Sequence, residues 1–218
     1  MIKRLDFRLA DYDEALTIQR GCFDELKKRK IAGMPIDNEI IFFVEHKPVF
    51  TLGKHAHKEN IINRKAIEKE SISIFETQRG GDITFHGPGQ LTVYPIIDLE
   101  KHRLGVKKYV ELLEQAIIDV LADYGLRGER VEGATGVWID AGLPSERKIC
   151  AIGIKCSRFI TMHGLALNIS TDLRYFSFIN PCGFVDKGVT SMQRELGYSP
   201  DFDEISERLF RRLLFLLS

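Results

Sequence analysis

The sequence predicts a single α/β domain in which helices pack on a mixed β-sheet. Strand-like runs recur along the chain and are interleaved with only a few helices, without the strict βαβ alternation of a parallel sheet. Residues 105–124 repeat their apolar side chains at the helical period. No internal repeat, low-complexity stretch or linker divides the 218 residues, so we expect one domain over 1–218.

The N-terminal part predicts a strand, a long helix and a buried strand in that order. Residues 2–9 alternate loosely, as a strand does. Asp11 and Glu14 match the capping box that opens a helix, which we expect to run to about Lys30. Its buried face would consist of Ala15, Ile18, Cys22 and Leu26. After a loop, the apolar run at 39–45 is bounded by charges, which is typical of a fully buried strand.

The middle of the chain predicts a short helix at 63–70, strands at 71–76 and 91–99, and the clearest helix at 105–124. That helix ends at Gly125, the residue type that most often follows a helix. Its apolar stripe consists of Val106, Tyr109, Val110, Leu113, Ala116, Ile117, Val120 and Leu121.

The C-terminal part predicts paired strands followed by short helices. The strands are expected at 127–132, 135–140, 148–155 and 159–169. The helical segments are expected to be a turn at 172–178, a short helix at 190–196 closed by Gly197, and a terminal amphipathic helix that starts at Ser199-Pro200.

Composition excludes several classes of protein. Apolar residues make up 44% and charged residues 28%, and 31 basic side chains balance 31 acidic ones. This is the mixture of an ordinary globular protein, and bulk charge favours neither a nucleic-acid nor a membrane partner. Asp6 and Arg8 stand where a signal peptide needs apolar residues, so we expect a cytoplasmic protein. The four cysteines include no C-x-x-C pair, so neither a disulfide framework nor a structural zinc site is expected.

The stretch 77–98 holds the densest glycine pattern, with Gly80, Gly81, Gly87 and Gly89. Glycine lets the backbone turn sharply and approach a ligand closely. The stretch also carries polar side chains suited to binding, namely Arg79, Thr84, His86 and Gln90. Composition alone leaves two interpretations open, a ligand-binding loop or plain turns between strands.

Cys182 is the strongest candidate nucleophile. It lies in N-P-C-G-F, where a proline precedes and a glycine follows, so a substrate can reach it more readily than a cysteine within a strand. A reactive cysteine needs a cation nearby, because the pKa of a free thiol is about 8.5. The candidate cations are Lys148, Lys155, His86 and His163. Each also has a plainer interpretation: a turn cysteine, a solvated strand-end lysine, or a hydrogen-bonded core histidine.

Several motifs together resemble the lipoyl(octanoyl) transferases, the acyltransferases of lipoate biosynthesis. The longest is R-G-G-D-I-T-F-H-G-P-G-Q-L-T-V-Y-P at 79–95. The others are E-H-K-P-V-F-T-L-G (45–53), G-V-W-I (136–139), R-K-I-C-A-I-G-I-K (147–155), H-G-L-A-L-N (163–168) and N-P-C-G (180–183). Lys47 and Phe50 depart mildly from the family pattern, outside the catalytic positions.

The resemblance implies the fold of the biotin/lipoate protein ligase catalytic domain, with a mostly antiparallel sheet. It also implies octanoyl transfer from the phosphopantetheine of octanoyl-acyl carrier protein to a lysine of lipoyl domains, the first step of endogenous protein lipoylation. The acceptors would be 2-oxoacid dehydrogenases and the glycine cleavage H protein. A monomer that needs neither ATP nor a metal is implied.

Site residues follow from the same resemblance. Cys182 would carry the acyl group as a thioester, and Lys148 would lower the pKa of Cys182 and relay protons. The substrate-binding residues would be Arg79, Gly80, Gly81, Asp82, Ile83, Thr84, Phe85, His86, Ala151, Ile152, Gly153, Gly164, Leu165 and Ala166.

Three other functions compete with this one. An ATP-dependent lipoate or biotin ligase would share the fold, but its glycine loop differs and adenylate chemistry needs no thiol. A silent acyl- or protein-binding module would have no use for Cys182 together with Lys148. A cysteine hydrolase would require His163 and Asn168 to complete a Cys–His–Asn set.

Overall fold

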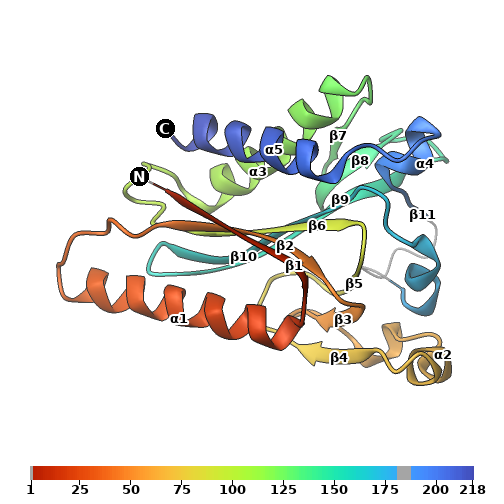
Figure 1. Cartoon of the computed structure of the whole chain (residues 1–218), viewed down its shortest axis with the longest axis horizontal. Helices are drawn as coiled ribbons and strands as arrows, with labels where there is room; N and C mark the ends of the chain where they lie inside the picture. The colour runs from red at the N-terminus through yellow and green to blue at the C-terminus, as the bar shows by residue number, and fades with distance from the viewer. Residues whose placement is uncertain (1, 181–187) are drawn as a thin grey trace.

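The computed structural model describes residues 2–180 and 188–218, and these form one large and one small β-sheet (Figure 1). Within the described residues the large sheet has eight strands in the order β1-β2-β6-β10-β9-β8-β7, with β11 paired to β9. The strands are β1 (Lys3–Ala10), β2 (Ile40–His46), β6 (Gln90–Ile96), β7 (Glu129–Val131), β8 (Ala134–Ile139), β9 (Arg147–Ser157), β10 (Ile160–Asn168) and β11 (Gly188–Val189). Only the β1–β2 and β9–β11 pairs of this sheet are parallel, which confirms the mixed, mostly antiparallel arrangement.

The small sheet has the order β4-β3-β5, and its strands are β3 (Val49–Leu52), β4 (Ser73–Glu76) and β5 (Ile83–His86). Each strand has only four residues. The small sheet buries one face in a cluster of its own that includes Phe50, Ile83 and Phe85. Short strands alone are marginally stable, so this cluster is what holds the small sheet together.

Helices cover the two faces of the large sheet differently (Figure 1). Helices α3 (Val106–Asp123) and α5 (Phe202–Leu217) pack on one face and form the largest apolar core. Helix α1 (Tyr12–Ile31) packs on the opposite face against β6 and β10. The short helices are α2 (Arg64–Lys69), α4 (Met192–Leu196) and the 3₁₀ turns η1 (Lys58–Asn60) and η2 (Leu173–Phe178). Throughout 2–180 and 188–218, no helix combines the length and the apolarity needed to cross a bilayer.

The helices and strands predicted from the sequence are confirmed, with two corrections in α1. Asp11 stands at the N-cap position, but its carboxylate binds Lys47 Nζ at 2.8 Å and caps no backbone N–H. The predicted buried face is also displaced, because Ile18 is 40% exposed and Cys22 lies only half-buried at the margin. The residues that α1 does bury are Tyr12, Ala15, Leu16, Gln19, Phe23 and Leu26. The predicted and observed buried faces of α1 are offset around the helix by about one residue, a difference that the spacing of apolar residues alone does not resolve.

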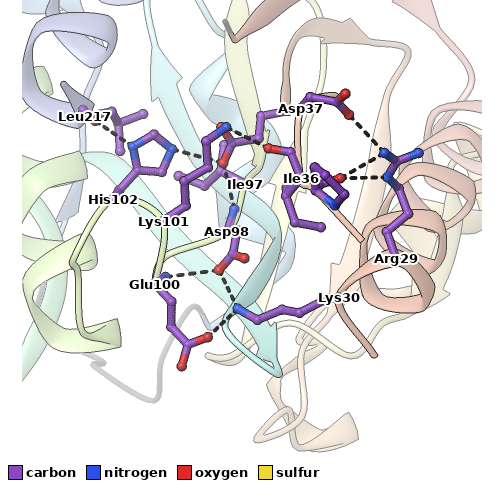
Figure 2. A network of polar contacts seen from close by, with 12 residues as sticks. Arg29, Lys30, Ile36, Asp37, Ile97, Asp98, Glu100, Lys101, His102 and Leu217 are labelled. Atoms are coloured by element: carbon purple, nitrogen blue, oxygen red, sulfur yellow. Dashed lines mark hydrogen bonds and ion pairs between the residues drawn. The ribbon is translucent and has the colours of Figure 1, made fainter. Parts of the chain in front are cut away.

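A charged network joins the start of β2 to the C-terminal end of α5 (Figure 2). Glu39 is 1% exposed and accepts hydrogen bonds from Lys101 Nζ at 2.7 Å, His102 Nε2 at 2.9 Å and the Asp98 backbone N–H at 2.9 Å. His102 Nδ1 lies 2.6 Å from the Leu217 carbonyl oxygen. A carboxylate and a carbonyl can only accept, so both ring nitrogens of His102 donate and the ring is an imidazolium.

This network predicts a stability maximum in mildly acid solution. The hydrogen bond to Glu39 raises the pKa of His102, so its stabilisation is complete below about pH 6.5 and is lost as the pH rises through the raised value. Burial alone would raise the pKa of Glu39, but its hydrogen bonds outweigh burial and lower the pKa to about 2. The Glu39 contribution is therefore complete above about pH 4.5 and is lost as the pH falls toward 2.

We expect His102→Gln to lower the free energy of unfolding by about 1.5–3 kcal/mol at pH 6, the range for a hydrogen bond to a charged group. The difference should shrink as the pH rises, because wild-type His102 then loses its charge. Urea denaturation at pH 6 and pH 9 measures both values, with His57→Gln in an exposed loop as the control. A difference that is equal at the two pH values would contradict a charged His102.

Candidate active site

A cavity of about 780 Å³ lies between the large sheet, the glycine stretch and the small sheet. Its size falls in the range typical of small-molecule sites. Three segments that are distant in sequence line it together, namely 79–84, 151–154 and 163–166. These contain nearly all the substrate-binding residues that the sequence analysis named. They meet because β9 and β10 pair with Gly153 opposite Gly164, while the Gly80 N–H donates to the Ile154 carbonyl at 2.8 Å.

Glycine is required at two of these positions by close backbone packing. A Cβ atom on Gly153 would lie 2.7 Å from the Gly80 carbonyl oxygen. One on Gly164 would lie 2.1 Å from the Val93 carbonyl oxygen on β6. These separations are far below van der Waals contact, so any side chain would displace the backbone. The glycines therefore let the loop lie directly on β9 and leave the sheet backbone as one wall of the cavity.

Arg79 holds this loop against the small sheet. Its guanidinium donates to the Thr51 carbonyl at 2.6 Å, to Thr51 Oγ1 at 2.9 Å and to the Gly80 carbonyl at 3.0 Å. The residue is 8% exposed and also lines the cavity. The side chain thus braces the loop as well as bordering any ligand.

Phe85 is corrected from a binding residue to a packing residue. Successive side chains of a strand point to opposite faces. Thr84 and His86 line the cavity, whereas the Phe85 ring stacks on Tyr175 with centroids 4.5 Å apart, inside the cluster of the small sheet.

Lys148 also lines the cavity. It lies on β9 opposite Trp138 of β8, with its Nζ 4.5 Å from the centre of the Trp138 ring. Its stem passes over Gly136, where a Cβ atom would stand 3.5 Å from Lys148 Cε. Lys148 therefore borders the cavity, which is the position that the predicted catalytic role requires.

Two buried histidines also line the cavity. Burial lowers the pKa of His86 well below its usual range, and the nearby His46 and Arg79 lower it further. Burial lowers the pKa of His163 to about 3, with Arg79 adding to the effect. His163 has a positive φ of 59°, which is uncommon for a non-glycine residue and worth attention near a site. Both rings are neutral at physiological pH, so neither supplies the cation that a thiolate needs.

The structure also locates the other residues that the sequence analysis named as catalytic candidates, apart from Cys182. Lys155 donates to Gln78 and does not line the cavity. Asn168 bonds to Gln90 and to the Thr190 carbonyl, and within the described residues it has no bond to His163, so the His163–Asn168 pair that a cysteine hydrolase would require is not formed there. Cys182 lies outside the described residues. Gly188 and Val189, which follow in the chain, line the cavity, and Val189 pairs with Lys148.

Sequence reasoning missed several lining residues. Tyr12 comes from α1, Asn60 from η1, and His55 and His57 from an exposed loop expected to be merely solvated. Trp138 was placed correctly in a strand without a role. Trp138 is the single tryptophan of the sequence and lies within the G-V-W-I motif, and this was the signal that could have identified it.

The chain is similar to proteins of known name. The sequence profile of the lipoyl protein ligase A/B catalytic domain matches residues 11–214. An octanoyltransferase of Bacteroides fragilis (strain ATCC 25285) is 51% identical over 213 residues, which cover 97% of this chain and 96% of that one. An octanoyltransferase of Porphyromonas gingivalis (strain W83) is 52% identical over 206 residues, covering 92% of this chain and 42% of that one. This chain thus spans less than half the length of the second relative.

Solved structures share the fold. A chain from the bi-partite lipoate protein ligase system of Thermoplasma acidophilum aligns with a TM-score of 0.72 at 18% identity, covering 100% of this chain and 84% of that one. Lipoate-protein ligase A bound with ATP aligns at 0.70 and 16% identity, covering 99% of this chain and 84% of that one. Identities this low establish the architecture alone, and they confirm the fold class predicted from the sequence.

Proposed function

The chain belongs to the lipoyl protein ligase A/B catalytic-domain family, and on this premise we propose that it is an octanoyltransferase acting in protein lipoylation. The donor is octanoyl-acyl carrier protein and the acceptor is the ε-amine of one lysine on a lipoyl domain. One observation carries the proposal: the glycine stretch, the β9–β10 backbone and Lys148 border a single cavity. That convergence supports a site in which an acyl chain lies against the sheet backbone and Lys148 exchanges protons.

The cavity suits a medium-length acyl chain. Its wall at Ala151, Gly153, Gly164 and Ala166 carries small side chains or none, so an aliphatic chain can lie along the backbone. Burial of each methylene contributes about 0.8 kcal/mol, which favours octanoyl over much shorter chains. Backbone N–H groups of the glycine loop are suited to stabilise a carbonyl oxyanion.

Transfer takes place in two steps. Lys148 accepts the Cys182 thiol proton, and the thiolate attacks the carbonyl carbon of the donor thioester. The tetrahedral intermediate expels the pantetheine thiolate, which takes the proton from Lys148, and octanoyl-Cys182 remains. The acceptor amine then attacks this thioester, loses a proton to Lys148 and forms the amide, while the Cys182 thiolate leaves. A covalent intermediate divides one difficult transfer into two easier ones. Each step starts from a thioester, so the proposal requires neither ATP nor a metal.

The test is the intact mass of the protein after mixing with octanoyl-acyl carrier protein in the absence of an acceptor. We expect a gain of one octanoyl group, which disappears when a lipoyl domain from a 2-oxoacid dehydrogenase or the glycine cleavage H protein is added. The acceptor should gain the same mass. Absence of the adduct, combined with activity that requires ATP and free octanoate, would assign the chain to the ligase reaction instead.

A further inference from the structure

A continuous chain of buried hydrogen bonds runs from Arg79 to Thr190, the residue after strand β11, and four of its members line the cavity, namely Arg79, His86, Gln90 and Asn168. Thr51 Oγ1 lies 2.9 Å from Arg79 Nη2 and 3.3 Å from His86 Nε2. His86 Nδ1 lies 2.7 Å from Gln90 Oε1, and Gln90 Nε2 lies 2.8 Å from Asn168 Oδ1. Asn168 Nδ2 then lies 3.0 Å from the Thr190 carbonyl oxygen. Every member is at most 8% exposed.

The direction of each bond follows from its two ends. The Thr190 carbonyl can only accept, so Asn168 donates to it with its NH₂ group and presents its oxygen to Gln90. Gln90 therefore donates through Nε2, which also reaches the Phe85 carbonyl at 3.1 Å. Its oxygen must then accept from His86 Nδ1–H. His86 is left with a lone pair on Nε2, which accepts the Thr51 hydroxyl proton while Arg79 donates to the Thr51 oxygen.

The hydrogen-bond chain ends at strand β9, which carries Lys148. The Thr190 N–H donates to the Lys148 carbonyl at 2.9 Å, and Val189 pairs with Lys148 across β11 and β9. The Thr190 hydroxyl donates to Glu195, which also pairs with Arg147. One set of bonds thus spans the cavity from the loop held by Arg79 to the backbone of Lys148.

We propose that Gln90 is a positioning residue of the acyl transfer: its amide holds His86 in the Nδ1–H tautomer and, through Asn168 and Thr190, holds the backbone of Lys148 in register with β11. The inference rests on the proposed function, because Lys148 is the group positioned. Gln90 is central because, among the residues that the structure describes, its side-chain amide is the one that bonds to both His86 and Asn168. An amide is required there, since the position must accept on one side and donate on the other.

The surroundings of His86 favour the neutral ring that this chain requires. His46 from β2, Arg79 from the glycine stretch and His163 from β10 all act against a positive charge on it. Tyr12 from α1 stacks parallel to it at 6.1 Å. The three charged or titratable groups that act most strongly on His86, namely His46, Arg79 and His163, include no carboxylate.

Gln90→Glu is the sharpest test, because glutamate has the same shape but only accepts. It cannot donate to Asn168 or to the Phe85 carbonyl, and its charge beside Nδ1 favours a second proton on His86. We expect kcat to fall about tenfold to a hundredfold, as for a small misplacement of reacting groups, with KM for the donor changed less than about threefold. The pH profile of kcat should gain a new acid limb from His86 titration that the wild type lacks.

Matched variants separate positioning from simple loss of packing. Thr51→Val should lower kcat in the same way, and Thr51→Ser should restore it, because serine keeps the hydroxyl. Thr92→Val is the control: Thr92 is equally buried on β6, and its hydroxyl donates to the Val44 carbonyl, outside the chain. We expect it to keep the wild-type kcat. Thermal melting of each variant checks that the fold is retained.

The tautomer is measured independently of activity by ¹⁵N NMR of the histidine-labelled protein. We expect His86 to carry its proton on Nδ1 in the wild type and to titrate at a higher pH in Gln90→Glu. This measurement remains possible if the wild type transfers no octanoyl group. A failure of the proposed function can therefore be told apart from a failure of the proposed role of Gln90. A proton on Nε2, or folded Gln90→Glu and Thr51→Val enzymes with wild-type kcat and pH profiles, would overturn the inference.

Discussion

Cys182→Ser should lower the rate of octanoyl transfer by about a thousandfold or more, and Cys182→Ala should do the same. The proposed reaction passes through a thioester on Cys182, and neither replacement forms one at a useful rate. Single-turnover transfer from octanoyl-acyl carrier protein measures the rate, and intact mass should show no adduct on either variant. Cys22→Ala removes a half-buried thiol on α1 and should transfer at the wild-type rate.

Alkylation by iodoacetamide tests the same residue in another way. Burial raises the pKa of the Cys22, Cys150 and Cys156 thiols, so these three should react slowly at neutral pH. Rapid loss of activity, with a single alkylated site at Cys182, is therefore expected. Transfer at the wild-type rate by Cys182→Ser would remove the covalent intermediate from the mechanism.

Lys148→Ala should lower kcat by about 10²–10⁴-fold, the range of a general acid–base group. Acylation and release of the octanoyl group should both slow, because the same amine moves a proton in each step. Lys148→Arg should not restore the rate, since a guanidinium keeps its charge and cannot pass a proton on. Separate measurement of adduct formation and of transfer to a lipoyl domain resolves the two steps.

Lys155→Ala is the matched control for Lys148, since Lys155 lies on the same strand but outside the cavity. It should keep the wild-type kcat. The pH dependence of Cys182 alkylation should shift to higher pH in Lys148→Ala, because the proposed mechanism assigns to Lys148 the positive charge that stabilises the thiolate. An unchanged alkylation profile together with unchanged kcat would exclude Lys148 from the reaction.

The sequence predicted most of the helices and strands because the signals that set them are local. Residues 105–124 and the terminal helix carry their periodicity within one segment, and the run at 39–45 is apolar throughout. The small sheet was harder to predict from the sequence. Its strands have four residues each, and β3 pairs with β4 and β5 only after an intervening segment has folded back. No local pattern encodes such pairing.

The candidate site, too, was predicted only in part from the sequence. Motif resemblance selected Lys148 and the three lining segments without reference to structure. It also included Phe85, because a contiguous motif does not say which face of a strand each residue occupies. The sequence did not show whether the Lys148 side chain points to solvent or into a cleft. The structure places it opposite Trp138, at the cavity. Asn168 was considered only as a partner of His163, whereas its contacts are with Gln90 and Thr190.

The sequence by itself determined the fold class and the succession of elements, and it supplied the candidate residues for acyl transfer, since propensity, periodicity and motif identity belong to short segments. Only the tertiary structure decided that 79–84, 151–154 and 163–166 border one cavity, that Gly153 and Gly164 are required by backbone contact, and that Gln90 joins His86 to Asn168. These are contacts between residues up to 78 positions apart. They depend on how two sheets and a loop pack together, which no single segment of the chain specifies.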